Sequence, residues 1–160
     1  MSKFNILFNR IIFESSFDNP DFITLNNKYF SSKNVICKYS SHSIDRVIER
    51  TFIENEDMSI SEQEEKIKEN IGAAIDHIIN NKNLVKQIKS KELSRLSVEI
   101  RVSTKKFNNK QHLHLIIPMI WKAKINKFNV IIKTIYFSKN IQLNNKINHP
   151  ADIVIVIDGI

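Results

Sequence analysis

The 160-residue sequence is poor in cysteine, glycine and proline, with one, two and three residues of each. The single Cys37 excludes an internal disulfide framework and zinc sites built from several cysteines, and it favours a reducing compartment. Glycine-rich phosphate loops, dinucleotide-binding turns and nucleophile elbows need glycine at several fixed positions, and only Gly72 and Gly159 are present. No apolar run approaches the roughly 18 residues of a membrane span, and residues 1–6 lack a secretion signal. We therefore expect a soluble, cytoplasmic protein that uses no cofactor.

Acidic residues are scarce in the second half of the chain. Residues 1–81 carry 9 Lys and Arg against 13 Asp and Glu, a net charge of −4. Residues 82–146 carry 15 against 2, a net charge of +13. A field this one-sided favours a polyanion, because neutralised phosphates release their condensed counterions. A coding bias toward Lys, Asn and Ile is the alternative, but it would not remove acids from one half alone, so we expect a nucleic-acid partner.

Apolar periodicity predicts three helices in the first half. The first covers residues 3–16, the second begins after a serine cap at residue 40 or 41, and the third covers about 62–81. The acidic stretch 54–65 is predicted as a loop that ends in a capping segment. RNA would be repelled from this stretch.

Beyond residue 95 the period changes to two, which predicts strands over about 95–103, 112–121, 128–137 and 152–157. We expect an α+β fold in one domain over residues 1–160, with N-terminal helices (about 1–90) packed on a C-terminal antiparallel sheet (about 95–157). His112 and His114 share a face of their strand. Without a nearby carboxylate or cysteine, this pair favours a solvated or RNA-facing surface over a metal site.

The second predicted helix separates into two faces. Its apolar face holds Ile44, Val47, Ile48 and Thr51, and its polar face holds His42, Arg46, Glu49 and Arg50. A nuclease that uses the ribose 2′-hydroxyl as nucleophile needs a base, an acid and a cation beside the phosphate, and no metal. The candidate catalytic residues for this chemistry are His42, Arg46, His77 and Glu14. The alternative is that His42 lies beside a helix cap on a solvated face and that Arg46 is an ordinary surface charge.

Two motifs resemble a known family. Residues Lys38 to Arg50, Lys-Tyr-Ser-Ser-His-Ser-Ile-Asp-Arg-Val-Ile-Glu-Arg, resemble the Lys-Tyr-Ser-x-His-x-x-Asp-Arg-x-Ile-x-Arg segment of the RegB-type early endoribonucleases of T4-like phages. Upstream, Phe-Glu-Ser-Ser-Phe at residues 13–17 is similar to that family's Phe-Glu-Ser-x-Phe. A shorter form of the first motif also occurs in toxin-like domains of the RelE and YoeB superfamily.

The resemblance implies a RelE-like fold and an activity. It places His42 and Arg46 on the family's catalytic histidine and arginine, and Glu14 on its functionally important glutamate. His77 matches the second histidine if residues 54–65 are an insertion. The family cuts single-stranded, purine-rich GGAG-type sequences in messenger RNA without a metal, with the help of a ribosomal protein. A phage-encoded member would act in the cytoplasm of the bacterial host.

We expect the RNA to contact Arg50, Arg101, Lys105, Lys106 and Lys133. Two other classes of function stay open. One is a non-catalytic RNA- or ribosome-binding protein, whose phosphate contacts would come from Lys105, Lys106, Lys110, Lys122, Lys124 and Lys127. The other is an inhibitor or subunit that acts through protein contacts, for which the apolar run 151–157 would suit an added edge strand or the seam of a homodimer.

Overall fold

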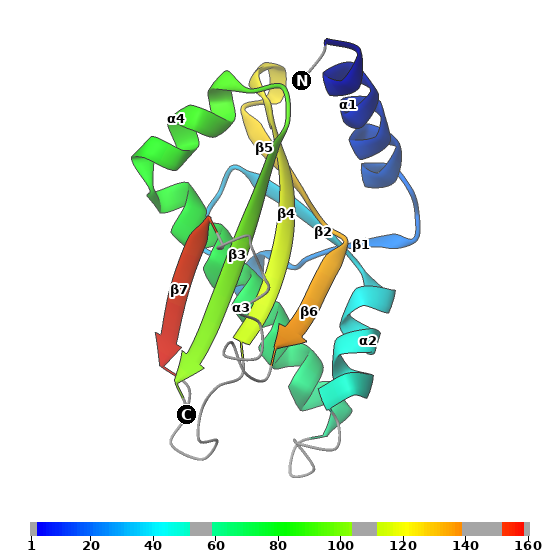
Figure 1. The fold of residues 1–160 in the computed structure, drawn as a ribbon, viewed down its shortest axis with the longest axis vertical. Helices are drawn as coiled ribbons and strands as arrows, with labels where there is room; N and C mark the ends of the chain where they lie inside the picture. Colours follow the sequence, from blue (N-terminus) through cyan, green and yellow to red (C-terminus); the bar gives the residue numbers. More distant parts are fainter. Residues whose placement is uncertain (1–2, 52–58, 104–111, 139–151, 159–160) are drawn as a thin grey trace.

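The computed structural model describes residues 3–51, 59–103, 112–138 and 152–158, and it shows an α+β fold. The helices are α1 (Lys3–Phe17), α2 (Ser41–Thr51), α3 (Ile60–Asn80) and α4 (Lys82–Ser90), with short 3-10 turns η1 (Asn27–Tyr29) and η3 (Ala123–Ile125). The strands are β1 (Phe22–Thr24), β2 (Val35–Ser40), β3 (Ser94–Ser103), β4 (His112–Lys122), β5 (Lys127–Ile132), β6 (Thr134–Ser138) and β7 (Ile153–Asp158). Figure 1 shows the strands side by side, with α1 and α2 near one edge and α4 near the other.

All seven strands belong to one sheet, ordered β1-β2-β5-β4-β3-β7, with β6 paired to β4 beyond the end of β5. The predicted α+β fold with an antiparallel sheet is confirmed, since most strand pairs are antiparallel. Two pairs that the sequence did not predict are parallel, β2 with β5 and β3 with β7. The helical first half also supplies two strands, β1 and β2. Residues 128–137, predicted as one strand, are divided at Lys133 into β5 and β6.

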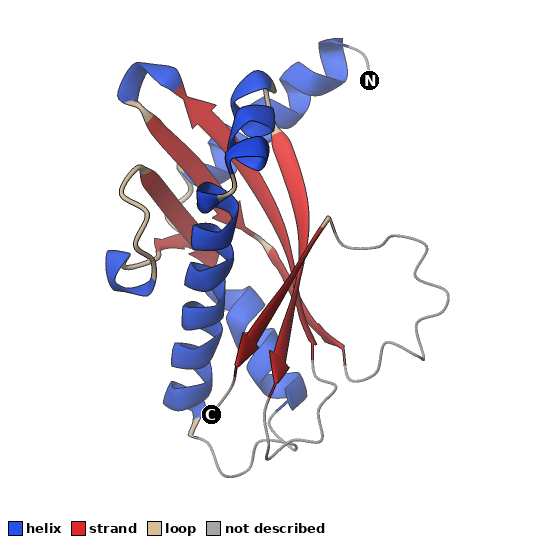
Figure 2. Ribbon diagram, turned by 90° about the vertical axis from the view of Figure 1, so that its left-hand side faces the viewer, coloured by secondary structure: helices blue, strands red, loops and turns tan. Residues whose placement is uncertain are grey.

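The long helix α3 covers one face of the sheet, as Figure 2 shows. It starts earlier than predicted, at Ile60, because the Ser59 hydroxyl accepts a hydrogen bond from the amide of Glu62. Its apolar stripe is buried as the spacing predicted: Ile67, Ile71, Ala74, Ile75 and Ile78. This stripe packs into a large core with α2, α4 and the sheet side chains that point toward α3. Burial of this kind contributes about 25 cal/mol per Å² of apolar surface, so it is the main stabilising contact of the fold.

Helix α4 was not predicted. Asn81 ends α3 and starts α4, since its amide donates to the carbonyl of Ile78 and its side chain accepts from the amide of Leu84. A single asparagine thus changes the direction of the chain. Ile88 is the buried residue of this short helix.

The opposite face of the sheet has much less cover. Helix α1 lies over one end of it, where Phe13 forms a small apolar cluster with Ile120 and Ile131. The prediction of a helix was confirmed, but the apolar residues that suggested it, Phe8, Ile11 and Ile12, are 53%, 55% and 43% exposed. Among the described residues, no helix covers the rest of this face.

None of the helices within the described part of the chain is both long enough and apolar enough to cross a membrane.

We expect Gly72→Ala to destabilise the fold. A Cβ at position 72 would lie 1.9 Å from the backbone oxygen of Tyr29, so η1 or α3 must shift to admit it. Overpacking of this kind costs about 1–3 kcal/mol of unfolding free energy, which urea denaturation measures. Ser61→Ala, an exposed change in the same helix, is the control and should have a small effect. Equal midpoints for wild type and Gly72→Ala would contradict this packing.

Candidate functional site

Helix α2 is fixed against the sheet by its first turn. Ile44, Val47 and Ile48 are buried, as predicted from the helical spacing. The hydroxyl of Ser43 donates a hydrogen bond to the backbone carbonyl of Lys133, at the junction of β5 and β6. This contact places the start of α2 beside the point where the sheet changes from β5 to β6.

His42 and Arg46 both lie on the exposed side of α2, one helical turn apart. Neither side chain has a hydrogen bond or ion pair with any residue that the structure describes. Both groups are therefore available to a ligand. An imidazole can exchange a proton near neutral pH, and a guanidinium can hold two oxygens of a phosphate.

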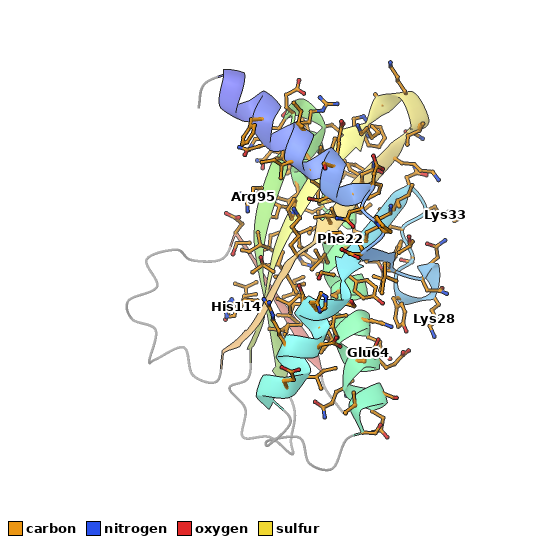
Figure 3. All side chains as sticks on the ribbon, turned by 90° about the vertical axis from the view of Figure 1, so that its right-hand side faces the viewer. Phe22, Lys28, Lys33, Glu64, Arg95 and His114 are labelled. Carbon is orange, nitrogen blue, oxygen red and sulfur yellow. The ribbon has the colours of Figure 1, made fainter. Side chains whose placement is uncertain are left out.

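Beside α2 lies the sheet face opposite α3, which we call the open face and define by Phe22, Lys38, Arg95, His114 and Lys133. Figure 3 shows Arg95 and His114 on the same side of the sheet as α1, with Glu64 of α3 on the other side. Strand alternation explains this placement. On β4, for example, His114 lies between Leu113 and Leu115, which are buried toward α3.

Two lysines of the open face reach the C-terminal end of α1. The ammonium of Lys133 donates to the hydroxyl of Ser16 at 2.6 Å and lies 5.8 Å from the ring centroid of Phe22. The ammonium of Lys38 donates to the backbone oxygen of Phe17 at 2.6 Å. Desolvation and the nearby charge of Arg95 lower the pKa of Lys133. Both lysines are thus held in place by neutral oxygens.

The structure does not bring His77 together with His42. Asp76, next to His77, accepts hydrogen bonds from Ser31 and Ser32, which precede β2, whereas His42 follows the end of β2. The six residues of β2 span about 16 Å.

The direction of α3 supports this separation. Its Lys68 ammonium lies 5.6 Å from the ring of Tyr39 near the end of β2. His77 lies nine residues further on, about 14 Å along the helix axis. The two imidazoles therefore do not form a pair around one phosphate in this structure.

Glu14 is held in an ion-pair network on α1. Its carboxylate accepts hydrogen bonds from Lys122 and, at 3.5 Å, from Arg10. The hydrogen bond from Lys122 is the main cause that lowers the pKa of Glu14, against a smaller opposing effect of burial. Glu14 has no contact with His42 or Arg46, so the structure connects it to the packing of α1 on β4.

The structure describes the side chains of only some of the other residues predicted to bind RNA. Lys133 lies on the open face. Arg50 is in α2 and Arg101 is in β3, paired in register with His112, but the structure describes only their backbones. Lys105, Lys106 and Lys110 lie outside the described residues.

Sequence reasoning missed Lys38 and Arg95 as neighbours of the site, whereas it placed His114, with His112, on a solvated or RNA-facing strand face. The signal for Lys38 is the alternation of buried Val35, Cys37 and Tyr39 in β2, which places Lys38 on the opposite face. Arg95 and His114 follow the same rule on their strands. Their proximity to Lys133 depends on strand order, which local sequence does not encode.

No cluster of three or more His, Cys, Asp or Glu side chains suited to a metal occurs within the described part of the chain. The thiol of Cys37 is fully buried, and burial raises its pKa, which makes it a poor nucleophile.

Comparison of the chain with protein-family models, with curated proteins and with solved structures finds no match in any of the three. The resemblance to RegB-type nucleases therefore depends on the two sequence motifs alone.

We expect Glu14→Gln to lower stability in a pH-dependent way. A carboxylate whose pKa is lowered by folding stabilises the fold above its unfolded pKa, and this contribution is lost as the pH falls through the lowered value. At 43% exposure the loss at pH 7 should be at most about 1 kcal/mol. Urea denaturation at pH 7 and at progressively lower pH measures it. A difference between the two proteins that grows as the pH falls would contradict the ion-pair network.

Proposed function

We propose that the chain is a metal-independent endoribonuclease for single-stranded RNA. The observation that carries the proposal is the pair His42 and Arg46, exposed on one side of α2 without partners among the described residues. Their helix is joined to Lys133 of the open face by the hydrogen bond from Ser43. The guanidinium of Arg46 can attract a phosphodiester, and the imidazole of His42, one helical turn away, can accept the proton that starts cleavage. The two RegB-like motifs support the same assignment, since they include both residues.

The reaction that these groups can perform is an intramolecular transesterification, in which the phosphate of the RNA backbone exchanges its 5′-oxygen for the neighbouring 2′-oxygen. His42 accepts the proton of a ribose 2′-hydroxyl, the 2′-oxygen forms a bond to phosphorus, and the bond from phosphorus to the 5′-oxygen breaks. Arg46 stabilises the charge on the phosphate oxygens in the transition state. Solvent supplies the proton for the leaving 5′-oxygen. The products are a 2′,3′-cyclic phosphate and a 5′-hydroxyl.

This proposal assigns no catalytic role to His77 or Glu14. His77 lies near the other end of β2, and Glu14 is committed to Lys122 and Arg10. The reaction therefore uses one imidazole, where the sequence predicted two. A protein with one imidazole at its site is a slower nuclease than one with a matched acid and base, because each proton transfer group contributes about a hundredfold or more.

The same observation favours a second candidate function, a non-catalytic RNA-binding protein. In that case the open face binds single-stranded RNA and His42 contacts the RNA without cleaving it. A cleavage assay separates the two functions, since both predict binding and only the first predicts a cyclic phosphate product.

We expect His42→Ala to lower the rate of RNA cleavage by at least about a hundredfold, because it removes the proton acceptor. Arg46→Ala should have a similar effect through the lost charge. Gel analysis of a labelled single-stranded RNA measures both. Ser61→Ala, at an exposed position of α3, is the control and should cleave at the wild-type rate. A near-normal rate in His42→Ala would leave the RNA-binding function as the better candidate.

Chemical changes in the substrate test the mechanism independently of the protein. A single 2′-deoxy nucleotide at the scissile position should abolish cleavage, because the nucleophile is then absent, whereas EDTA should have no effect. Mass spectrometry of the products identifies the cyclic phosphate. Persistent cleavage of the deoxy substrate would show that the 2′-hydroxyl is not the nucleophile.

A further inference from the structure

Two cations of the open face flank β4, because Arg95 pairs in register with Pro118 of β4 and Lys133 precedes Thr134, which pairs with Ile116 of β4. Arg95 of β3 and Lys133, between β5 and β6, are both exposed. Within the described residues, neither has a carboxylate at ion-pair distance. The nearest acids along the chain from Phe22, Asp18 and Asp21, lie in the turn between α1 and β1 and pair with neither cation. Glu99, on the same face of β3, is buried and lies four residues further along the strand than Arg95, so within the described part of the chain no carboxylate pairs with either cation at close range.

The surroundings of Lys133 are preorganised for an anion. Its ammonium is positioned by one neutral hydrogen bond, to the hydroxyl of Ser16 at 2.6 Å, so two of its three donors stay available. Lys38, held at 2.6 Å from the backbone oxygen of Phe17, adds a third positive charge to the same face. The lowered pKa of Lys133 has its cause in desolvation and in repulsion by Arg95, and an anion between the two cations would relieve that repulsion.

An aromatic ring and the position of α2 indicate which anion fits. Phe22 is half-buried, packed against the small cluster of Phe13, Ile120 and Ile131, and its ring centroid lies 5.8 Å from the ammonium of Lys133. Cations that can bind a phosphate, next to a flat apolar ring that can stack on a base, are the combination that binds a nucleotide of a single strand. The backbone carbonyl of Lys133 accepts a hydrogen bond from Ser43, the neighbour of His42 in α2, so this site adjoins the start of the helix that carries His42.

We propose that Arg95 and Lys133 bind a backbone phosphate of single-stranded nucleic acid and that Phe22 stacks on the adjacent base. If the chain is the nuclease proposed above, this subsite holds the nucleotide next to the one whose phosphate reaches His42. The position of the subsite relative to the cleaved bond thus rests on the proposed function. Binding itself does not, because the residues of the subsite are distinct from His42 and Arg46.

Fluorescence anisotropy with a labelled, fully 2′-deoxy single-stranded oligonucleotide tests this subsite, because such a strand binds without being cleaved. We expect Arg95→Gln and Lys133→Gln each to weaken binding about tenfold, the scale of one charged hydrogen bond. Each should also reduce the slope of log affinity against log salt by about 0.7, the value for one lost contact to a single-stranded phosphate. Lys33→Gln is the matched control. Lys33 is exposed in the segment before β2, and its replacement should change neither quantity appreciably.

The role of Phe22 is tested with a strand that lacks bases. Phe22→Leu keeps an apolar side chain on β1, and it should weaken binding of the ordinary strand about tenfold while binding of an abasic strand stays the same. Thermal unfolding of each variant checks that the fold is intact. Arg95→Gln decides the outcome if Phe22→Leu or Lys133→Gln fails to fold, since Arg95 is exposed and has no hydrogen bond or ion pair among the described residues.

Each result distinguishes this subsite from the proposed nuclease activity. Unchanged affinity and salt slope in Arg95→Gln and Lys133→Gln would overturn the subsite, as would a wild-type protein that binds no strand. Competition by inorganic phosphate or a mononucleotide as strong as that by the strand would show a site for free phosphate. Loss of cleavage in His42→Ala with unchanged strand binding would support the nuclease, and normal cleavage in that variant would reject it while the subsite stands.

Discussion

Burial of the apolar stripe of α3 against one face of the sheet is the contact on which the rest of the structure depends. The sheet side chains that point toward α3 are almost all apolar and fully buried, so this one layer contains most of the hydrophobic stabilisation. The opposite face of the sheet therefore contributes much less of the hydrophobic stabilisation. Polar and charged residues can occupy it without loss of stability, and this is the reason that the proposed site lies there.

The junction between β5 and β6 connects the parts of the proposed site. At Lys133 the backbone accepts the hydroxyl of Ser43 from α2, and the side chain donates to Ser16 of α1. Two helices that are distant in the chain are thus positioned by one residue. A break in the strand pairing at this point frees the carbonyl from the sheet ladder, and the serine satisfies it.

Much of the fold was predictable from the sequence, because α2, α3 and β3 have strong periodicity that reports which side is buried. The same periodicity predicted that His42 and Arg46 share an exposed side. Strand partners were not predictable, since an alternating pattern is the same whether the neighbour is parallel or antiparallel. The distance between His42 and His77 was not predictable either, because it depends on the direction of α3 relative to β2. Only the tertiary arrangement contains that information.

The parallel pairing of β2 with β5 has a consequence for how the protein forms. Val35 pairs with Phe128, 93 positions later (128 − 35), so this side of β2 has no strand to join until most of the chain has been synthesised. Pairing over such a separation carries a large loop-closure cost and slows folding. During synthesis on the ribosome, one side of β2 can pair with β1, and the other side remains an unpaired edge. Until β5 has been synthesised, this side of β2 is open to pairing with other chains.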